Sequence, residues 1–115
     1  MSKNYVEPVH AGEFLLSEGA GKISREAIDL VPGAALPAGQ VLGQITATGL
    51  FAPYSSTAED GSEQAKCILF AGVAASEEQR RGRAVARLAE VVGDLLAGLD
   101  HDGEKALAAH FIIVR

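Results

Sequence analysis

The residues from Leu36 to Tyr54 constrain the fold most, because turn and strand signals alternate closely within them. Pro37 fits position i+1 of a β-turn and Gly39 fits position i+3, since proline fixes φ at about −65°. A strand is predicted to follow over residues 40–48, because apolar and polar side chains alternate there. The apolar face comprises Val41, Ile45 and Ala47, the polar face comprises Gln40, Gln44, Thr46 and Thr48, and Leu42 interrupts the alternation.

Glycine and proline subdivide this unit further. Gly43 lies mid-strand, where a missing side chain indicates a bulge, a bend or a close backbone approach. Thr48 and Gly49 are predicted to reverse the chain into a short apolar run that Pro53 ends. The result is a compact β unit without a catalytic constellation, which favours a scaffold over an enzyme.

Length and charge narrow the function classes. The chain has 115 residues, which suits one domain. Its net charge of −5 disfavours nucleic acid and anionic membranes as partners, because phosphate binding needs clustered Lys and Arg. A single cysteine excludes an internal disulfide. Without a membrane-length apolar run or a signal-peptide core, we expect a soluble protein that stays where it is made.

Residues 1–21 are predicted to form an N-terminal arm, because Pro8 and Gly12 interrupt them and no helical period is present. Two interpretations stay open at this point. A disordered terminus is one. The other is an extended peptide that adds a strand to the sheet edge of a partner, for which the segment offers apolar anchors. These anchors are Tyr5, Val6, Val9, Phe14, Leu15 and Leu16.

Several further elements follow from local pattern. Residues 24–31 fit a strand, residues 55–59 a polar loop, and residues 60–62 a turn. The apolar run 67–71 suits a buried strand, whereas the charged residues 76–83 suggest an exposed loop. Residues 104–110 favour a short helix with Asp102 as its N-cap, and residues 111–114 favour a strand.

Residues 83–99 carry a conflict. Apolar side chains recur there at helical spacing, which indicates an amphipathic helix. Gly93 interrupts that pattern and Gly98 follows, and each costs up to about 1 kcal/mol relative to alanine inside a helix.

Candidate reactive groups are sparse. His10, His101 and His110 form no metal-ligand spacing with each other or with Cys67. His101 lies between two aspartates in what we interpret as a solvated loop, and Cys67 is interpreted as a small buried hydrophobe. We therefore predict no enzyme activity, no cofactor and no metal site.

Five stretches of the chain carry a family resemblance: residues 21–26, 34–43, 45–49, 53–54 and 60–62. With these stretches, and over about residues 13–115, the chain resembles the lambda-type bacteriophage head decoration proteins. This resemblance implies a mainly β fold of the β-clip or β-tulip-like kind, with short helices and an extended N-terminal arm. The implied division is an arm over residues 1–21 and a decoration domain over residues 22–115. For the ambiguous segment it implies a strand over 84–91 and a helical turn over 94–99.

The same resemblance implies a function. Such proteins form homotrimers on the outside of the expanded phage head, at three-fold and quasi-three-fold positions. There they hold neighbouring copies of the major capsid protein against the pressure of packaged DNA, after a time in the host cytoplasm. The arm residues named above would bind the capsid. The structural core motif would comprise Pro37, Gly39, Val41, Leu42, Gly43, Ile45, Gly49 and Pro53.

Two other functions are considered. Residues 38–45 are similar to the strand that precedes the modified lysine of lipoyl and biotinyl domains, which would make this a barrel-sandwich carrier. However, Ala47, Thr48 and Gly49 occupy the hairpin tip, so the acceptor amine is missing. A small β-clip module that binds a sugar or a peptide is the third possibility, although no concentrated set of polar residues marks its pocket.

Overall fold

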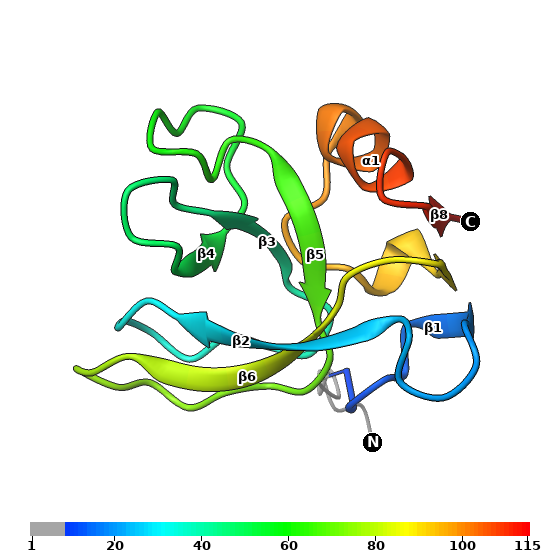
Figure 1. The fold of residues 1–115 in the computed structure, drawn as a ribbon, viewed down its shortest axis with the longest axis horizontal. Helices are drawn as coiled ribbons and strands as arrows, with labels where there is room; N and C mark the ends of the chain where they lie inside the picture. Colours follow the sequence, from blue (N-terminus) through cyan, green and yellow to red (C-terminus); the bar gives the residue numbers. More distant parts are fainter. Residues whose placement is uncertain (1–8) are drawn as a thin grey trace, which may run out of the picture.

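The computed structural model describes residues 9–115 and shows a mainly β domain with one short helix, as the sequence predicted. Figure 1 follows the chain from the N-terminal strand to the C-terminal strand. The elements are β1 (Leu15–Glu18), β2 (Arg25–Leu30), β3 (Val41–Gln44), β4 (Phe51–Pro53), β5 (Ala65–Leu69), β6 (Arg80–Val85), β7 (Ala89–Val91), the 3-10 turn η1 (Gly93–Leu95), α1 (His101–Ala108) and β8 (Ile112–Val114).

Five strands form a small closed barrel in the order β2-β4-β3-β5-β6. Its neighbours are antiparallel except for β2 and β4, which run parallel and are joined through the single pair Leu30 and Phe51. In contrast, β2 and β6 pair along the whole of β2, from Arg25 to Leu30. The barrel is therefore fully paired along the edge of β2 that faces β6 and is closed by one residue pair along the edge that faces β4.

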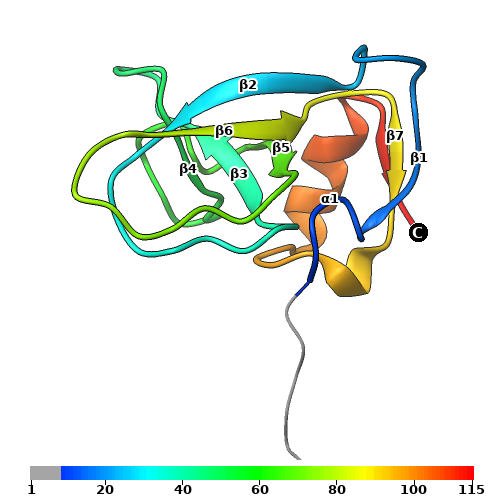
Figure 2. The same ribbon diagram turned by 90° about the horizontal axis from the view of Figure 1, so that it is seen from below.

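A separate three-stranded sheet, in the order β1-β7-β8, lies at one end of the barrel (Figure 2). β7 is antiparallel to β1 and parallel to β8. The helix α1 contacts both β5 of the barrel and β8 of this sheet. The small sheet and the helix together cover the outer faces of β3, β5 and β6.

Two hydrophobic cores result. The barrel core comprises Ile28, Leu30, Leu42, Cys67, Leu69 and Ala84. The outer core, between the barrel and the small sheet with α1, comprises Phe14, Val41, Tyr54, Ala65, Ile68, Val85, Ala89, Val91, Leu107 and Ile112. β3, β5 and β6 contribute side chains to both cores from their two faces. This double burial explains why Leu42 interrupts the alternation seen in the sequence.

The turn that begins at Pro37 differs from the prediction. The N–H of Gln40 donates to the carbonyl of Pro37 at 3.2 Å, so Pro37 occupies position i rather than i+1. Gly39 is then residue i+2 with φ of 90°, a value that a type II turn requires. The following strand is shorter than predicted, and Gln40 is buried with its amide donating to the carbonyls of Val41 and Ala97.

The remaining signals in this unit are confirmed. The β3–β5 register shifts between Leu42 and Gly43, and a Cβ on Gly43 would lie 2.6 Å from the Cα of Ser62. The chain then reverses, with the N–H of Gly49 donating to the carbonyl of Ile45 at 2.8 Å. β4 ends at Pro53.

The prediction of an exposed loop over residues 76–83 is wrong in its second half, because β6 begins at Arg80. Arg80 is only 9% exposed, and its guanidinium donates to the carbonyls of Val31, Ala34 and Ala74 at 2.7–3.1 Å. The side chain supplies donors to two loops that have no strand partner at those carbonyls. Charge alone could not reveal this, because the acceptors are brought together only by the fold.

The prediction of a single strand over residues 84–91 is also wrong. β6 ends at Val85 and β7 begins at Ala89, and Leu88 has φ of 56° at the corner between them. The locally indicated helix does not form, since its apolar residues join two different sheets. The predicted helical turn over 94–99 appears earlier and shorter, as η1.

The C-terminal helix begins three residues before the predicted start. Asp100, not Asp102, is the N-cap, and its Oδ1 accepts from the N–H of Gly103 at 2.7 Å. The same oxygen accepts from the Tyr54 hydroxyl at 2.7 Å, so a tertiary contact selects which aspartate caps the helix. His101 consequently lies in the first helical turn rather than in a solvated loop. The final strand is confirmed as β8, without Phe111.

Candidate functional site

The six predicted arm residues have different environments. Tyr5 and Val6 lie outside the described residues, and Val9 is half-buried. Phe14 is fully buried in the outer core, whereas Leu15 is half-buried and Leu16 is 55% exposed on β1. The prediction of an arm over residues 1–21 did not foresee that β1 pairs with β7 of the same chain.

A tight turn precedes β1 and attaches the N-terminal segment to the barrel. The N–H of His10 donates to Glu13 Oε1 at 2.8 Å, and the N–H of Gly12 donates to the carbonyl of Phe70 at 3.0 Å. Gly12 has φ of 70°, and a Cβ there would lie 2.9 Å from the Phe70 ring. Only glycine satisfies both the backbone conformation and the close approach.

Arg25 also contacts Phe70, next to this attachment. Its guanidinium lies 4.0 Å from the centre of the Phe70 ring and forms two hydrogen bonds with Glu18, at 2.6 and 3.0 Å. The hydrogen bond to Glu18 raises the pKa of Arg25 above its ordinary value, so the guanidinium stays charged at every physiological pH. A paired guanidinium over an aromatic ring is a rigid arrangement. We call Gly12, Glu18, Arg25 and Phe70 the arm anchor.

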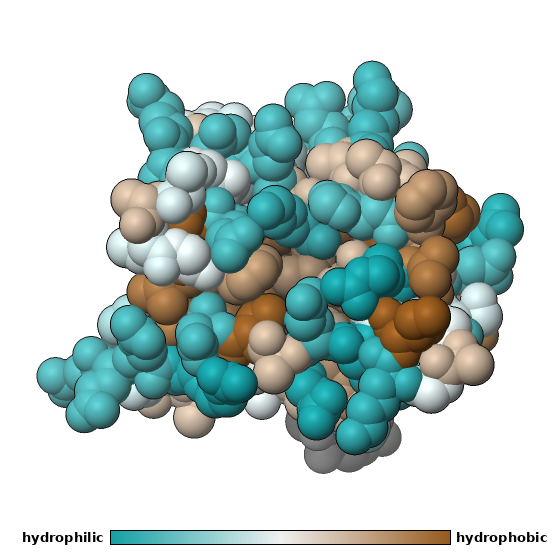
Figure 3. Space-filling model, viewed as in Figure 1, coloured by the Kyte–Doolittle hydropathy of each residue, from teal (hydrophilic) through white to brown (hydrophobic). Residues whose placement is uncertain are grey.

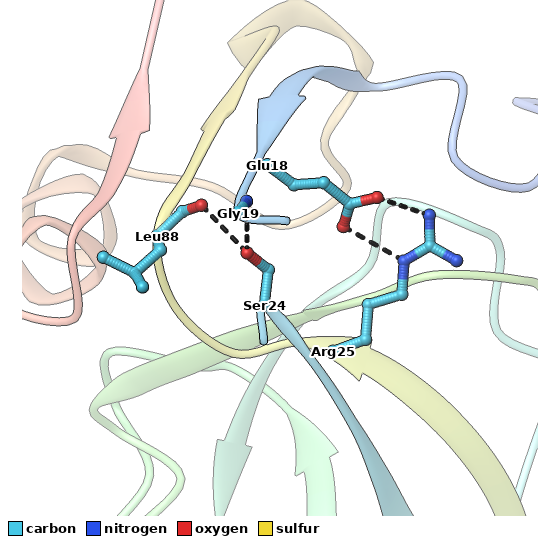
Figure 4. Close-up of polar contacts among 5 residues, drawn as sticks. All are labelled: Glu18, Gly19, Ser24, Arg25 and Leu88. Carbon is cyan, nitrogen blue, oxygen red and sulfur yellow. Dashed lines mark hydrogen bonds and ion pairs between the residues drawn. The ribbon is translucent and has the colours of Figure 1, made fainter. Parts of the chain in front are cut away.

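Ser24 joins three segments next to the arm anchor (Figure 4). Its hydroxyl accepts from the N–H of Gly19 at 2.7 Å and donates to the carbonyl of Leu88 at 2.9 Å. Ser24 is fully buried, and this pair of bonds fixes the loop after β1 to the corner before β7. The base of the N-terminal segment is therefore held by polar contacts as well as by Phe14.

Large apolar side chains remain exposed around the small sheet. Leu88 and Phe111 both have positive φ, of 56° and 62°, and stand at the starts of β7 and β8. Brown apolar side chains gather over these strands at the right of Figure 3. The exposed set comprises Leu16, Ile23, Leu88, Phe111 and Ile113. A cluster of this kind on a small domain marks an interaction surface.

The eight predicted core-motif residues differ in burial: four are buried, Ile45 is half-buried, and Pro37, Gly49 and Pro53 are exposed. Val41 enters the outer core and Leu42 enters the barrel core. The N–H of Gly39 donates to the carbonyl of Leu69 at 2.8 Å, and a Cβ on Gly39 would lie 2.6 Å from the carbonyl of Leu95. The remaining members are Pro37, Gly43, Ile45, Gly49 and Pro53.

The geometry offers contact surfaces and little reactive chemistry. Burial raises the pKa of the Cys67 thiol to about 12, so the thiol is protonated at neutral pH. Within residues 9–115, no three His, Cys, Asp or Glu side chains are grouped as a metal would require. No helix in the described part of the chain has the length and apolar character needed to cross a membrane.

Sequence reasoning missed the arm anchor. Arg25 and Glu18 read as ordinary surface charges, and Phe70 reads as the end of a buried strand. The one available signal was Gly12, a glycine two residues before the apolar run that begins at Phe14.

Comparison with known proteins identifies one family. The family described as Bacteriophage lambda head decoration protein D matches residues 4–112, which is nearly the whole chain. No individual curated protein matches significantly.

Proposed function

The chain belongs to the bacteriophage lambda head decoration protein D family, and on that premise we propose that it binds the expanded phage head as a homotrimer. In this proposal the trimer sits on the outer surface at three-fold and quasi-three-fold positions and stabilises the shell against internal DNA pressure. The family is one of structural capsid proteins, which supports a role in the virion rather than in catalysis. Before assembly, the protein would reside in the host cytoplasm.

The arm anchor supports the proposed mode of binding. The segment that ends at Val9 enters the domain through a turn fixed to Phe70, so its point of origin is well defined. We propose that Tyr5, Val6 and Val9 supply the side chains of a strand added to a capsid sheet edge. Phe14 and Leu15 would hold the base of the arm, and Leu16 would extend the contact from the exposed face of β1.

The energetics of binding favour an oligomer that carries more than one arm. Ordering each arm residue costs about 1–2 kcal/mol of backbone entropy, which ladder hydrogen bonds and side-chain pockets must offset. Three arms on one trimer convert the later binding steps into intramolecular ones, which raises affinity by about 10² to 10⁴-fold. Trimer formation would thus belong to the binding mechanism, and a shell with the wrong site spacing would engage fewer arms.

The exposed apolar side chains support association as well. Leu16 and Ile113 lie on strands of the small sheet. Leu88 and Phe111 directly precede its strands β7 and β8, and Ile23 lies in the loop after β1. In an assembly, these side chains would be covered by neighbouring copies or by the capsid protein.

Deletion of residues 1–9 tests this function, because the cut leaves the arm anchor and Phe14 in place. We expect the truncated protein to keep the trimer mass and the thermal unfolding midpoint of the full chain. Cosedimentation with expanded shells of the same phage should fall by at least about a hundredfold. Equal binding by both proteins would refute the role of the arm, and failure of the full chain to bind shells would refute the proposed function itself.

A further inference from the structure

The barrel has a seam along one edge of β2. β2 pairs with β6 at every residue, but its only pairing with β4 is between Leu30 and Phe51. From Arg25 to Asp29 this second edge has no strand partner in the part of the chain that the structure describes. An unpaired strand edge offers a row of backbone donors and acceptors.

Two hydrogen bonds show which backbone groups point into the seam. The carbonyl of Ser24 accepts from the N–H of Ala86, and the N–H of Val31 donates to the carbonyl of Phe51. Because alternate residues of a strand face opposite neighbours, residues 24, 26 and 28 face β6. The N–H and C=O groups of Ala27 and Asp29 therefore face the seam.

A groove of about 500 Å³ lies alongside this edge. Ala27 and Ile28 line it from β2, Phe51 and Cys67 from the neighbouring barrel strands, and Ala109 and Phe111 from the chain after α1. Apolar side chains show between polar ones near the middle of the face in Figure 3. The groove combines an apolar lining with a free strand edge, which is the arrangement that accepts an extended peptide.

Phe111 is a second, independent sign of a partner. It is 67% exposed and has φ of 62°, a conformation that is unfavourable for a bulky side chain. Its backbone position is fixed by the bond from the N–H of Ala89 to its carbonyl at 3.0 Å. A largely exposed ring at a strained position adds little packing to the fold, and such positions cluster at ligand-binding sites.

The charge of the groove indicates the chemistry of its occupant. Arg87 pairs with Glu26 at 2.8 Å, which leaves Lys66 as the net positive charge of the lining, although the whole chain carries −5. The local excess of positive charge favours a segment with an acidic residue beside its apolar ones.

We infer that the seam beside β2 accepts an extended apolar segment of the capsid protein, carrying an acidic residue, as an added strand that Phe111 covers. This inference rests on the proposed function and adds a second contact: the arm donates a strand to the shell, and the seam receives one. Attachment at two points would reduce the freedom of each subunit to rotate on the capsid.

Ala109 and Ala108 provide a matched pair of sites for a test. Both are exposed near the end of α1, but only Ala109 lines the groove. We expect Ala109→Arg to weaken binding to expanded shells about tenfold or more, and Ala108→Arg to leave it within about twofold. Ala27→Pro, which removes an N–H from the seam, should weaken binding similarly, whereas Ala27→Ser keeps that N–H and should not.

Phe111→Gly separates binding from folding. We expect weaker shell binding together with a thermal unfolding midpoint at or above that of the unaltered chain. The solution mass of every variant should equal that of the unaltered chain. Normal shell binding by Ala109→Arg and Ala27→Pro would overturn the inference, while the arm deletion above still tests the proposed function. A loss of oligomer mass would also overturn it, because the groove would then join copies of this chain.

Discussion

The barrel core and the outer core use opposite faces of the same strands but assemble in different ways. Barrel-core residues come from four strands, β2, β3, β5 and β6, which occur between residues 25 and 85. The outer core additionally needs Phe14 from the beginning of the chain, and Leu107 and Ile112 from its end. The barrel core is thus formed by the middle of the sequence, whereas the outer core also brings together residues from both ends of the chain.

The difference bears on stability because β3, β5 and β6 belong to both cores. If one face of these strands loses its packing, the other face loses part of its support. We therefore expect the two cores to unfold together, although they are filled by different parts of the sequence.

Among the substitutions that test the coupling of the two cores, Phe14→Ala should lower the free energy of unfolding most. Truncation of the fully buried ring is expected to cost about 3–5 kcal/mol of unfolding free energy. Leu69→Ala, in the barrel core, should cost about 2–5 kcal/mol. Urea unfolding followed by tyrosine fluorescence and by circular dichroism checks both variants. Two separate transitions in either protein would contradict the coupling of the cores.

Arg80 tests the far end of the barrel, away from the outer core. Arg80→Met leaves the carbonyls of Val31, Ala34 and Ala74 without their donor and should cost about 1–3 kcal/mol. Arg81 is a matched control, since it is exposed and its ion pair among residues 9–115 is with the exposed Asp29. Arg81→Met should change the unfolding free energy by less than about 0.5 kcal/mol. Equal losses for both variants would show that the buried bonds contribute nothing specific.

The Tyr54–Asp100 hydrogen bond should make the outer core sensitive to pH at both extremes. The Tyr54 hydroxyl holds the pKa of Asp100 below its ordinary value of 3.8, so this stabilisation is present above that pH and is lost as pH falls below it. Burial, and then the bond to Asp100, raises the pKa of Tyr54 from 10.0 to about 12. That contribution is present below pH 10 and is lost as pH rises through about 12.

Tyr54→Phe is the check, because it removes the hydrogen bond and the titrating hydroxyl together. Urea midpoints measured from pH 2 to pH 12 should show shallower losses in the variant at both ends. Identical profiles would rule out this contact as the source of the pH dependence.

Leu88→Gly should have the smallest effect, and of opposite sign. Glycine removes the cost of a positive φ at position 88, which is about 1–2 kcal/mol for a residue with a side chain. It also loses more conformational entropy on folding, which costs about 0.5–1 kcal/mol. A net gain below about 1 kcal/mol is expected from thermal unfolding. Leu16→Gly, on the exposed face of β1 without positive φ, should instead lose stability, and a loss in both variants would contradict the strain at Leu88.

The sequence predicted what depends on neighbouring residues. The β unit of residues 36–54, the buried strand with Cys67 and the bulge at Gly43 follow from local spacing and turn chemistry. The position of Pro37 in its turn was a local error, whereas the other wrong or missing predictions depend on contacts distant in sequence. Asp100 is chosen as helix cap by Tyr54, and Arg80 is buried by carbonyls of two remote loops.

The candidate site was less predictable than the fold. Phe14 was recognised as an apolar anchor, yet nothing near it in the sequence indicates that β7 will pair with the next residues. The arm anchor also combines residues from three separate segments, of which only Gly12 carries a local signal. The family resemblance predicted the function, but it did not predict the contacts of these side chains.

The attachment of Gly12 to Phe70 has a mechanical consequence. Phe70 directly follows β5, which lies between β3 and β6 in the barrel. Tension applied to the arm would therefore enter the domain at the strand that both cores clamp, instead of peeling away an edge strand. Pulling between an arm residue and Arg115 in a single-molecule experiment would show one high-force rupture if this is so, and an early low-force step if β1 detaches first. An arm attached directly after a strand that both cores hold would be retained by the packing of the whole domain.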